Sequence, residues 1–312
     1  MIDGGGVAAA CCDHLLTQGG IASYWANARR GAVPAIMLSD PARALLRDGL
    51  SRPDMFAANP RIMRRIVAWG GQEPVALPHA AVMLGAGDLD FSPRSSAGDA
   101  AEPDFTIRTA IDRAEPMHRF GDRQGETASV RLLHAEDADA CWVESVDDGW
   151  LFLIPSAAGS GWLLSVGAPC RDLLAQSRHV SPRIELGEDD PASFDTTPRM
   201  LATMAEPGLI SCGSSAMAFD PICGDGTALA VRQAILASAI VLSLNEGGDE
   251  TALLAHYRAM MTAAMRRHLR LSSEFYATGG TGPWWRAQQD AITKGFAALS
   301  NMLDREPPPQ FA

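Results

Sequence analysis

The chain has 312 residues, enough to bury a substantial core in one large domain or two closely packed ones. Its 37 acidic and 26 basic residues give a net charge of −11 without a long basic run, which argues against nucleic acid as a partner. Six cysteines show no C-x-x-C spacing or metal-type histidine pairing, so we expect no metal site and a reduced, cytoplasmic protein. We recognise no signal peptide and no long uncharged apolar segment, and therefore expect no membrane span.

The N-terminus carries a glycine-rich turn at the start of a predicted helix. The residues Gly4-Gly5-Gly6-Val7-Ala8-Ala9 fit the pattern G-x-G-x-x-G/A. In a dinucleotide-binding fold Gly4 would make the turn, Gly6 would admit a pyrophosphate, and Ala9 would pack the helix on the sheet. Only three residues precede Gly4, fewer than the roughly five or six of an average strand. A glycine-rich start without fixed structure is the alternative.

The next predicted strand, residues 21–25, is not followed by the usual acidic residue. In dinucleotide-binding folds this acid stands about 20 positions after the glycine motif and binds a ribose hydroxyl. Asn27 is near that position and could hydrogen-bond the adenosine ribose. Arg29 and Arg30 follow. They could meet a phosphate, which slightly favours an NAD(P)-binding enzyme, or they could be solvated loop charges.

The segment 34–104 begins with the largely apolar residues 34–39. A helical pattern follows over 40–50, with Ser39 or Asp40 as its cap. Another helix is expected around 61–68, followed by an apolar run over 80–84. From 85 to 104 the composition changes to Gly, Ser, Pro and acids, which predicts a surface loop.

Residues 105–204 are expected to form an antiparallel sheet. The β-rich runs, separated by turn signals, are 128–133, 140–146, 150–154 and 161–166. A short helix is expected over 170–176. The segment also holds a dense polar cluster, in which Arg119 or Arg123 could bind a substrate carboxylate or a flavin phosphate. Solvation at an edge strand is the alternative for both arginines.

The most informative stretch is residues 212–231, CGSSAMAFDPICGDGTALAV. An apolar run over 209–212 predicts a buried strand, and an Ala-rich helical pattern follows directly after Gly224 and Gly226 and runs to about residue 244. Glycines before the helix let a backbone approach a ligand closely, and the helix N-terminus offers free N–H groups and a positive dipole end. This arrangement suits the binding of a pyrophosphate.

The same stretch resembles the second FAD-binding motif of the group A flavoprotein monooxygenases and the related flavin-dependent tryptophan halogenases. Their pattern is Gly-Asp-Ala, then Pro-x-x-Gly-x-Gly, then an apolar helix. It is matched here by Gly213, Ala216, Pro221, Gly224 and Gly226. Ser214 stands where the family has the aspartate that binds the ribityl chain. A serine hydroxyl can still hydrogen-bond a polyol, but without charge assistance.

The resemblance implies an FAD site built from both glycine motifs. Its expected cofactor-binding residues are Gly4, Gly6, Ala9, Asn27, Gly213, Ser214, Asp220, Pro221, Gly224, Asp225, Gly226 and Thr227. In the family, the backbone at Asp220 and Pro221 runs close to the isoalloxazine ring. Asp220 is therefore the candidate catalytic residue, as an orienting or proton-handling group. Capping of the turn before Pro221 is its alternative role.

A second resemblance lies in residues 149–155, GWLFLIP. They are similar to the Trp-x-Trp-x-Ile-Pro signature of the halogenases, with Phe152 in place of the second Trp. In that family the motif lies beside the flavin–substrate tunnel, which implies that Trp150, Phe152 and Pro155 line it; an ordinary core strand is the alternative. Halogenation also needs a tunnel lysine. The only lysine, Lys294, is far away in sequence, so halogenation is not expected.

The predicted fold is α/β, with a Rossmann-like FAD-binding domain interleaved with an antiparallel β substrate domain and a helical C-terminal region. The expected boundaries are 1–104 and 205–248 for the FAD-binding domain, 105–204 for the substrate domain, 249–306 for the C-terminal helices and 307–312 for a tail. A methionine-containing stripe in the C-terminal helices is more typical of core packing than of a cofactor site.

The expected function is that of an FAD-dependent oxidoreductase, with monooxygenase-type hydroxylation of an aromatic or side-chain substrate through a flavin hydroperoxide. The substrate would be a small molecule or a peptide side chain. Reduced flavin could come from a separate flavin reductase, because the Asp-Gly motif through which many group A hydroxylases manage NAD(P)H and FAD is not recognisable. The alternative is a degenerate, flavin-free or weakly flavin-binding relative that acts as a binding or maturation partner.

Overall fold

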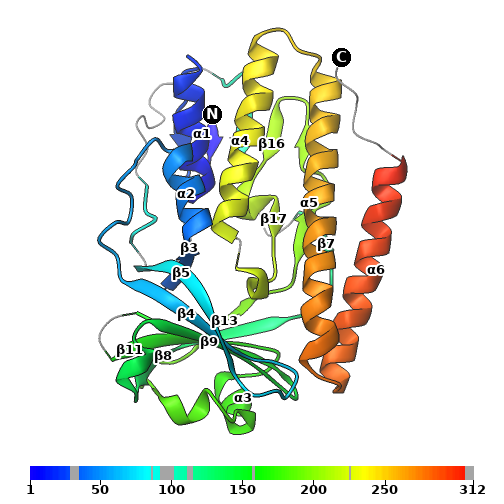
Figure 1. Ribbon diagram of the computed structural model, residues 1–312. Helices are drawn as coiled ribbons and strands as arrows, with labels where there is room; N and C mark the ends of the chain where they lie inside the picture. Colours follow the sequence, from blue (N-terminus) through cyan, green and yellow to red (C-terminus); the bar gives the residue numbers. More distant parts are fainter. Residues whose placement is uncertain are drawn as a thin grey trace.

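The computed structural model describes residues 1–28, 35–85, 87–91, 102–110, 115–156, 159–224 and 226–305. A largely helical half and a β-rich half stack on each other (Figure 1). The helices are α1 (Gly6–Gln18), α2 (Asp40–Gly49), α3 (Cys170–Gln176), α4 (Gly226–Asn245), α5 (Glu250–Gly279) and α6 (Pro283–Arg305). Short 3₁₀ turns are η1 (Ala135–Asp137), η2 (Ser181–Arg183), η3 (Gly213–Ser215) and η4 (Pro221–Cys223).

A five-stranded, mainly parallel sheet forms the Rossmann-like part of the fold. Its order is β15 (Ala205–Glu206), β16 (Leu209–Ser211), β6 (Thr106–Arg108), β1 (Ile2–Asp3) and β2 (Trp25–Ala26). The strands β16, β6, β1 and β2 run parallel, and only β15 is antiparallel. Because parallel strands end at the same edge, the segments that follow β1, β2, β6 and β16 gather there. This is the Rossmann-like arrangement expected from the sequence.

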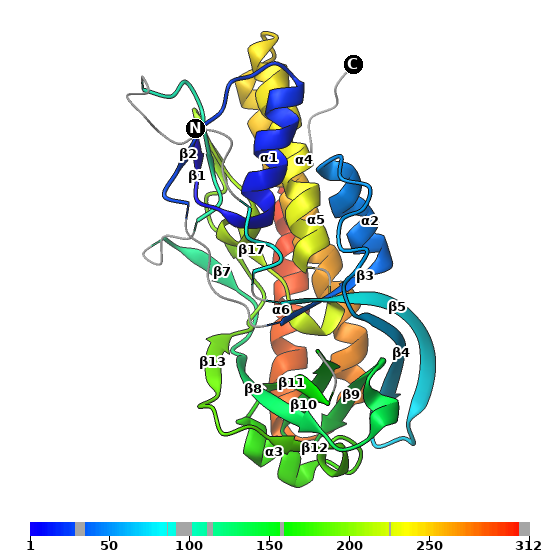
Figure 2. The same ribbon diagram turned by 90° about the vertical axis from the view of Figure 1, so that its left-hand side faces the viewer.

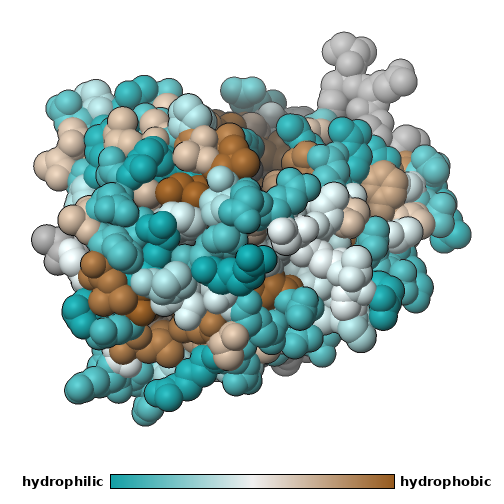
Figure 3. Space-filling model, turned by 60° about the horizontal axis from the view of Figure 1, so that its bottom comes forward, coloured by the Kyte–Doolittle hydropathy of each residue, from teal (hydrophilic) through white to brown (hydrophobic). Residues whose placement is uncertain are grey.

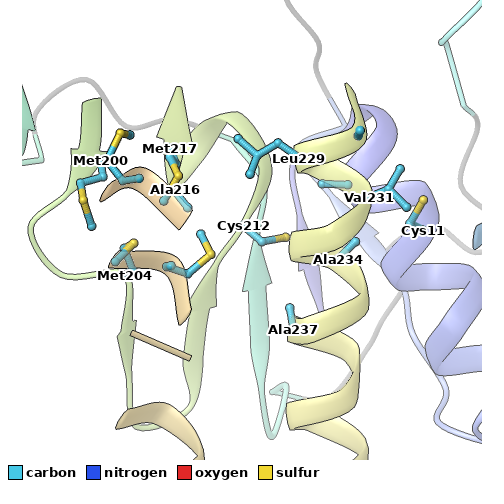
Figure 4. Packing of buried hydrophobic residues seen from close by; sticks show 14 of the residues in the cluster. Cys11, Met200, Met204, Cys212, Ala216, Met217, Leu229, Val231, Ala234 and Ala237 are labelled. Carbon is cyan, nitrogen blue, oxygen red and sulfur yellow. The ribbon is translucent and has the colours of Figure 1, made fainter. Parts of the chain in front are cut away.

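The helices α1 and α4 lie side by side (Figures 1 and 2). Small side chains let them approach the strands closely: Cys212, just after β16, lies beside Ala234 and Ala237 of α4 (Figure 4). The Sγ atoms of Cys12 and Cys212 are 4.0 Å apart. Cys11 is fully buried, and its burial raises the pKa of its thiol to about 12, so it is a packed core thiol.

The helix α4 is long and apolar enough to cross a membrane by length and composition. It contains Arg232, so it is not the uncharged segment that the sequence was expected to lack. Half of its most apolar window is buried inside the protein, where α4 packs against α1, α2 and α5. A core helix of a globular protein has the same composition, and these contacts account for the apolar character of α4.

A nine-stranded, mainly antiparallel sheet builds the other half. It comprises β12 (Ile184–Leu186), β8 (Gln124–Leu132), β11 (Ser160–Val166), β10 (Gly149–Pro155), β9 (Ala140–Val146), β4 (Arg61–Ala68), β5 (Val75–Gly85) and β3 (Ala35–Ser39) in order, with β13 (Ala192–Asp195) also on β8. Its own core lies on one face, under α3. A third sheet has the order β17 (Met217–Ala218), β14 (Arg199–Leu201) and β7 (Met117–Arg119).

The helix expected around 61–68 is wrong, because this segment is strand β4. Ile62, Ile66 and Ala68 are buried while Arg61 and Met63 are exposed, and the strand pairs with β5 and β9. The strands β3, β4 and β5 therefore belong to the same sheet as the strands of 105–204. This differs from the expected boundary, which gave all of residues 1–104 to the FAD-binding domain.

Candidate functional site

The first glycine motif lies at the carboxyl end of β1, directly before α1. Gly4 has φ +119°, and a Cβ there would lie 2.5 Å from the backbone N of Ala110. Gly6, with φ +82°, begins α1, and the cap residue Gly5 provides no side-chain hydrogen bond. Packing against Ala110 therefore requires glycine at position 4. Because Gly5 adds no side-chain cap, the first N–H groups of α1 are available for an anion.

The structure brings the two glycine motifs together. Gly213 has φ +68°, and a Cβ there would lie 2.8 Å from the Cβ of Ala8 on α1. The Gly213 N–H also donates to Oε1 of Gln233 on α4, at 2.6 Å. Ala9 is fully buried, as expected of the position that packs α1 on the sheet. The N-terminal motif and the Gly213 motif thus form one contiguous structure.

Two polar positions open onto this edge of the sheet. Asn27, just after β2, has φ +48°, and its Nδ2 donates to Oδ1 of Asp3 at 2.9 Å. Ser214 is exposed, and its hydroxyl has no hydrogen-bond partner in the described part of the chain. Its neighbour Ser215 is instead buried and donates to the Arg108 and Cys212 carbonyls. Arg29 and Arg30 lie outside the described residues.

The N-terminus of α4 is also open. A Cβ added at Gly224 or at Gly226 would meet no atom within 4 Å among the residues that the structure describes. Gly224 has φ +60°, which favours glycine, whereas Gly226 has no such restriction. Thr227 is half-buried in the first turn of α4, and Asp225 lies outside the described residues. The first turn of α4 contains no acidic residue in its described part, so its dipole end can receive negative charge.

Asp220 is fully buried at the start of the turn that precedes α4. Its Oδ1 accepts the Ile222 N–H at 3.0 Å, which is the capping role left open by the sequence. Its Oδ2 accepts the Tyr276 hydroxyl at 2.7 Å and lies 3.2 Å from Nη1 of Arg123. Burial raises the pKa of Asp220, and the Arg123 charge opposes this shift. His268 on α5 also contacts Asp220, by accepting its backbone N–H. We call Arg123, Asp220, His268 and Tyr276 the Asp220 network.

Arg123 is not a solvated arginine at an edge strand. Its side chain is 0% exposed, and its guanidinium lies 4.4 Å from the centre of the Tyr276 ring. None of its three guanidinium nitrogens forms a hydrogen bond with the described residues. Arg119, in contrast, is partly exposed and pairs with Asp195 at 2.8 Å. Of the two arginines that the sequence singled out, only Arg123 belongs to the candidate site.

The residue that completes the network, His268, was missed in the sequence. Its Nε2 accepts the backbone N–H of Asp220 at 2.9 Å, and its ring stacks on Phe219 with centroids 4.0 Å apart. His268, Ser272 and Tyr276 recur every four residues on α5, so they share one helix face. This repeat was the available signal, and the other polar and charged residues of α5 obscured it.

The three expected tunnel residues lie on β10. Trp150 is 1% exposed, and its Nε1 donates to the Tyr276 hydroxyl at 3.4 Å, which links the strand to the Asp220 network. Phe152 is half-buried and Pro155 is buried. They lie on a core strand, and their place beside a tunnel remains a prediction.

One described cavity, of about 420 Å³, lies elsewhere, between the ends of β4, β9 and α5. It is lined by 68, 70–72, 144–147, 176, 178–179 and 277–281, none of which belongs to the expected site. The lower face of the β-rich half is mostly hydrophilic, with separate hydrophobic patches (Figure 3). Neither feature overlaps the glycine motifs.

No family model and no curated protein matches the sequence. Solved structures do match. The flavin-dependent halogenase CmlS has a TM-score of 0.77 at 16% identity, over 100% of this chain and 73% of that one. The peptidyl tryptophan dihydroxylase QhpG, essential for tryptophylquinone cofactor biogenesis, has a TM-score of 0.75 at 19% identity, over 92% and 78%.

A probable FAD-dependent monooxygenase from Pseudomonas aeruginosa, pqsL, matches with a TM-score of 0.64 at 13% identity, over 96% of this chain and 98% of that one. Identities this low show the fold alone. The chain therefore shares its Rossmann-type fold with flavin-dependent halogenases and monooxygenases. This confirms the fold class expected from the sequence.

His268 should make the stability of the protein depend on pH. Burial, together with the nearby Arg123 charge, lowers the pKa of His268 to about 3. The unfolded chain, with an ordinary histidine pKa of about 6.5, binds this proton more readily. The free energy of unfolding should therefore fall as the pH drops below about 6.5, by about 2 kcal/mol at pH 5. Above about pH 6.5 His268 should make no contribution to the pH dependence of the free energy of unfolding.

Urea unfolding of wild type and His268→Gln between pH 7.5 and pH 4.5 measures this effect. The difference between the two proteins isolates His268 from Asp220, whose raised pKa acts in the opposite direction. Parallel pH profiles for the two proteins would contradict the assignment.

Proposed function

We propose that this protein is an FAD-dependent oxidoreductase that hydroxylates an aromatic or peptide side-chain substrate by monooxygenase-type chemistry. The observation that carries the proposal is the contact between the two glycine motifs, with Gly213 against Ala8 and the N-termini of α1 and α4 open. The fold shared with flavin-dependent enzymes supports it. The finer terms, the substrate and the reaction, rest on the resemblance of the sequence motifs.

The residues present fit FAD at most positions. The N–H groups at the start of α1 would hold the pyrophosphate, and Asn27 would bind the adenosine ribose. Asp3 supplies a carboxylate beside Asn27, although the acid usually found after the second strand is missing. The Ser214 hydroxyl, which has no partner among the described residues, would bind the ribityl chain. The start of α4 would lie at the ring, where its dipole end stabilises negative charge.

When bound, FAD would supply the oxygen chemistry, and the protein would position the substrate and exclude water. The buried, hydrogen-bonded state of Asp220 favours its orienting role over direct proton exchange with a substrate. We further propose a separate reductase as the source of reduced flavin and the cytoplasm as the location.

The competing proposal is a flavin-free or weakly flavin-binding partner protein. Ser214 in place of aspartate and Asn27 in place of the ribose acid favour it, because each removes a charge-assisted hydrogen bond. Losing two such bonds could cost about 3 kcal/mol, or roughly a hundredfold in affinity.

A visible absorption spectrum of the full chain, before and after incubation with excess FAD and desalting, tests the proposal. We expect a retained two-band flavin spectrum near one FAD per chain. FMN is the matched control. It lacks the adenosine and one phosphate, so it should be lost on desalting if α1 and Asn27 hold those groups. A folded protein that retains neither flavin would favour the partner protein.

A further inference from the structure

We infer that Arg123, His268 and Tyr276 are positioning residues that fix the turn 220–224 and thereby set the place of the flavin ring relative to the substrate sheet. The part of this inference that concerns the ring rests on the proposed function. The part that concerns the turn rests on the geometry of the Asp220 network alone.

The Asp220 network joins three parts of the fold that are distant in sequence. Arg123 lies in the turn between β7 and β8, Asp220 precedes η4, and His268 and Tyr276 lie on α5. Trp150 of β10 adds a further strand of the substrate sheet through the Tyr276 hydroxyl. The network therefore connects the substrate sheet, the C-terminal helical layer and the turn that leads into α4.

Hydrogen bonds hold the turn on both sides of Pro221. His268 Nε2 accepts the Asp220 N–H at 2.9 Å, and the Asp220 carboxylate accepts the Ile222 N–H at 3.0 Å. The carboxylate is itself held by Tyr276 at 2.7 Å and Arg123 at 3.2 Å. The turn then ends at Gly224, where φ is +60°. Its backbone is thus fixed by side chains that belong to other elements.

Stability alone does not explain this arrangement. A buried ion pair can often be replaced by apolar residues of similar volume without loss of stability, because desolvation cancels much of the attraction. Arg123 is an extreme case, since its buried guanidinium nitrogens form no hydrogen bond in the described part of the chain. A role in fixing the position of the turn 220–224 would explain why a buried arginine stands beside it.

The histidine is suited to a fixed acceptor role. Burial and the Arg123 charge keep its pKa near 3, so Nε2 retains its lone pair at neutral pH. Glutamine can place its side-chain oxygen at about the reach of Nε2, whereas leucine cannot accept a hydrogen bond. His268→Gln and His268→Leu are therefore a matched pair that differs mainly in the acceptor for the Asp220 N–H, at 2.9 Å, and for the Ser272 hydroxyl, at 3.3 Å.

The first measurement is amide hydrogen exchange over 219–224 in the full chain without FAD. His268→Leu should exchange about tenfold faster in this segment, because the Asp220 N–H loses its buried acceptor. His268→Gln should stay within about threefold of wild type. Ile184→Val, a mild packing loss in the substrate sheet, is the control for general destabilisation and should leave the segment unchanged.

The second measurement is the visible spectrum and the reduction potential of bound FAD. His268→Leu and Arg123→Met should shift both, and His268→Gln should restore the wild-type values. If His268→Leu does not fold, Arg123→Met provides the test of the network in its place. Unchanged exchange in His268→Leu would overturn the fixing of the turn. Altered exchange with an unaltered flavin spectrum and potential would overturn the link to the ring. If wild type binds no FAD, the proposed function fails, and the exchange data still decide whether the turn is fixed.

Discussion

Replacing Gly226 by leucine should abolish FAD binding and leave the fold intact. A Cβ at Gly226 meets no described atom within 4 Å, and the residue begins α4 without a left-handed φ. Leucine is also favoured over glycine in a helix by about 1 kcal/mol, so the free energy of unfolding should stay within about 1 kcal/mol of wild type. The added side chain would occupy space that the protein leaves open. We expect at least a hundredfold weaker FAD binding.

Flavin fluorescence titration and urea unfolding of the same preparations measure the two effects. Thr251→Leu is the matched control, because it places the same side chain at an exposed position in the first turn of another long helix, α5. It should change neither quantity. Gly226→Leu with wild-type FAD affinity would show that the α4 N-terminus is not the flavin site.

The glycine motifs show where sequence reasoning stops. The sequence predicted Gly4, Gly213, Gly224 and Gly226 alike as cofactor-binding residues, with Gly4 making the turn of its motif. The structure divides them: a Cβ at Gly4 or Gly213 would meet neighbouring protein atoms, whereas a Cβ at Gly224 or Gly226 would meet no described atom within 4 Å. A glycine needed for packing and a glycine that leaves room for a ligand look identical in a sequence motif, so only the coordinates distinguish them.

The fold could be predicted where the signal is local. The β-rich runs around 140–166 form β9, β10 and β11 as expected, and burial alternates clearly along β11. The segment 61–68 failed because its three arginines and two isoleucines also fit a helical period, and its partners β5 and β9 decide the matter. The local sequence of a strand does not show which distant strand it pairs with.

The Asp220 network could not be predicted from the sequence for a related reason. Charged side chains are almost never fully buried unless they are paired, so Arg123 was expected to bind a ligand or to be solvated at an edge strand, and its burial was not expected. Its partner, Asp220, lies about 100 residues further along the chain, and His268 is one of many polar residues in the mixed sequence of α5. Asp220 itself was identified through the family resemblance, which fixed its position but not its partners.

Replacing Asp220 by asparagine should destabilise the protein by about 3–5 kcal/mol. Asparagine keeps the shape of the side chain and an oxygen that can accept the Ile222 N–H. It removes the only carboxylate that pairs with Arg123 among the described residues, and the guanidinium is 0% exposed. An uncompensated buried charge carries a penalty of this size. Urea unfolding at pH 7.5 measures it.

The double variant Arg123→Met/Asp220→Asn distinguishes this cause from general damage to the turn. Methionine fills part of the arginine volume without a charge, so the double variant should regain most of the lost stability. Non-additivity of at least 2 kcal/mol in the double-mutant cycle is expected for groups in direct contact. If the double variant is as unstable as the sum of the two single ones, the loss comes from the turn and not from the charge of Arg123. Recovery would show that the pair contributes little net stability, which leaves the placement of the turn as the reason for a buried ion pair at this site.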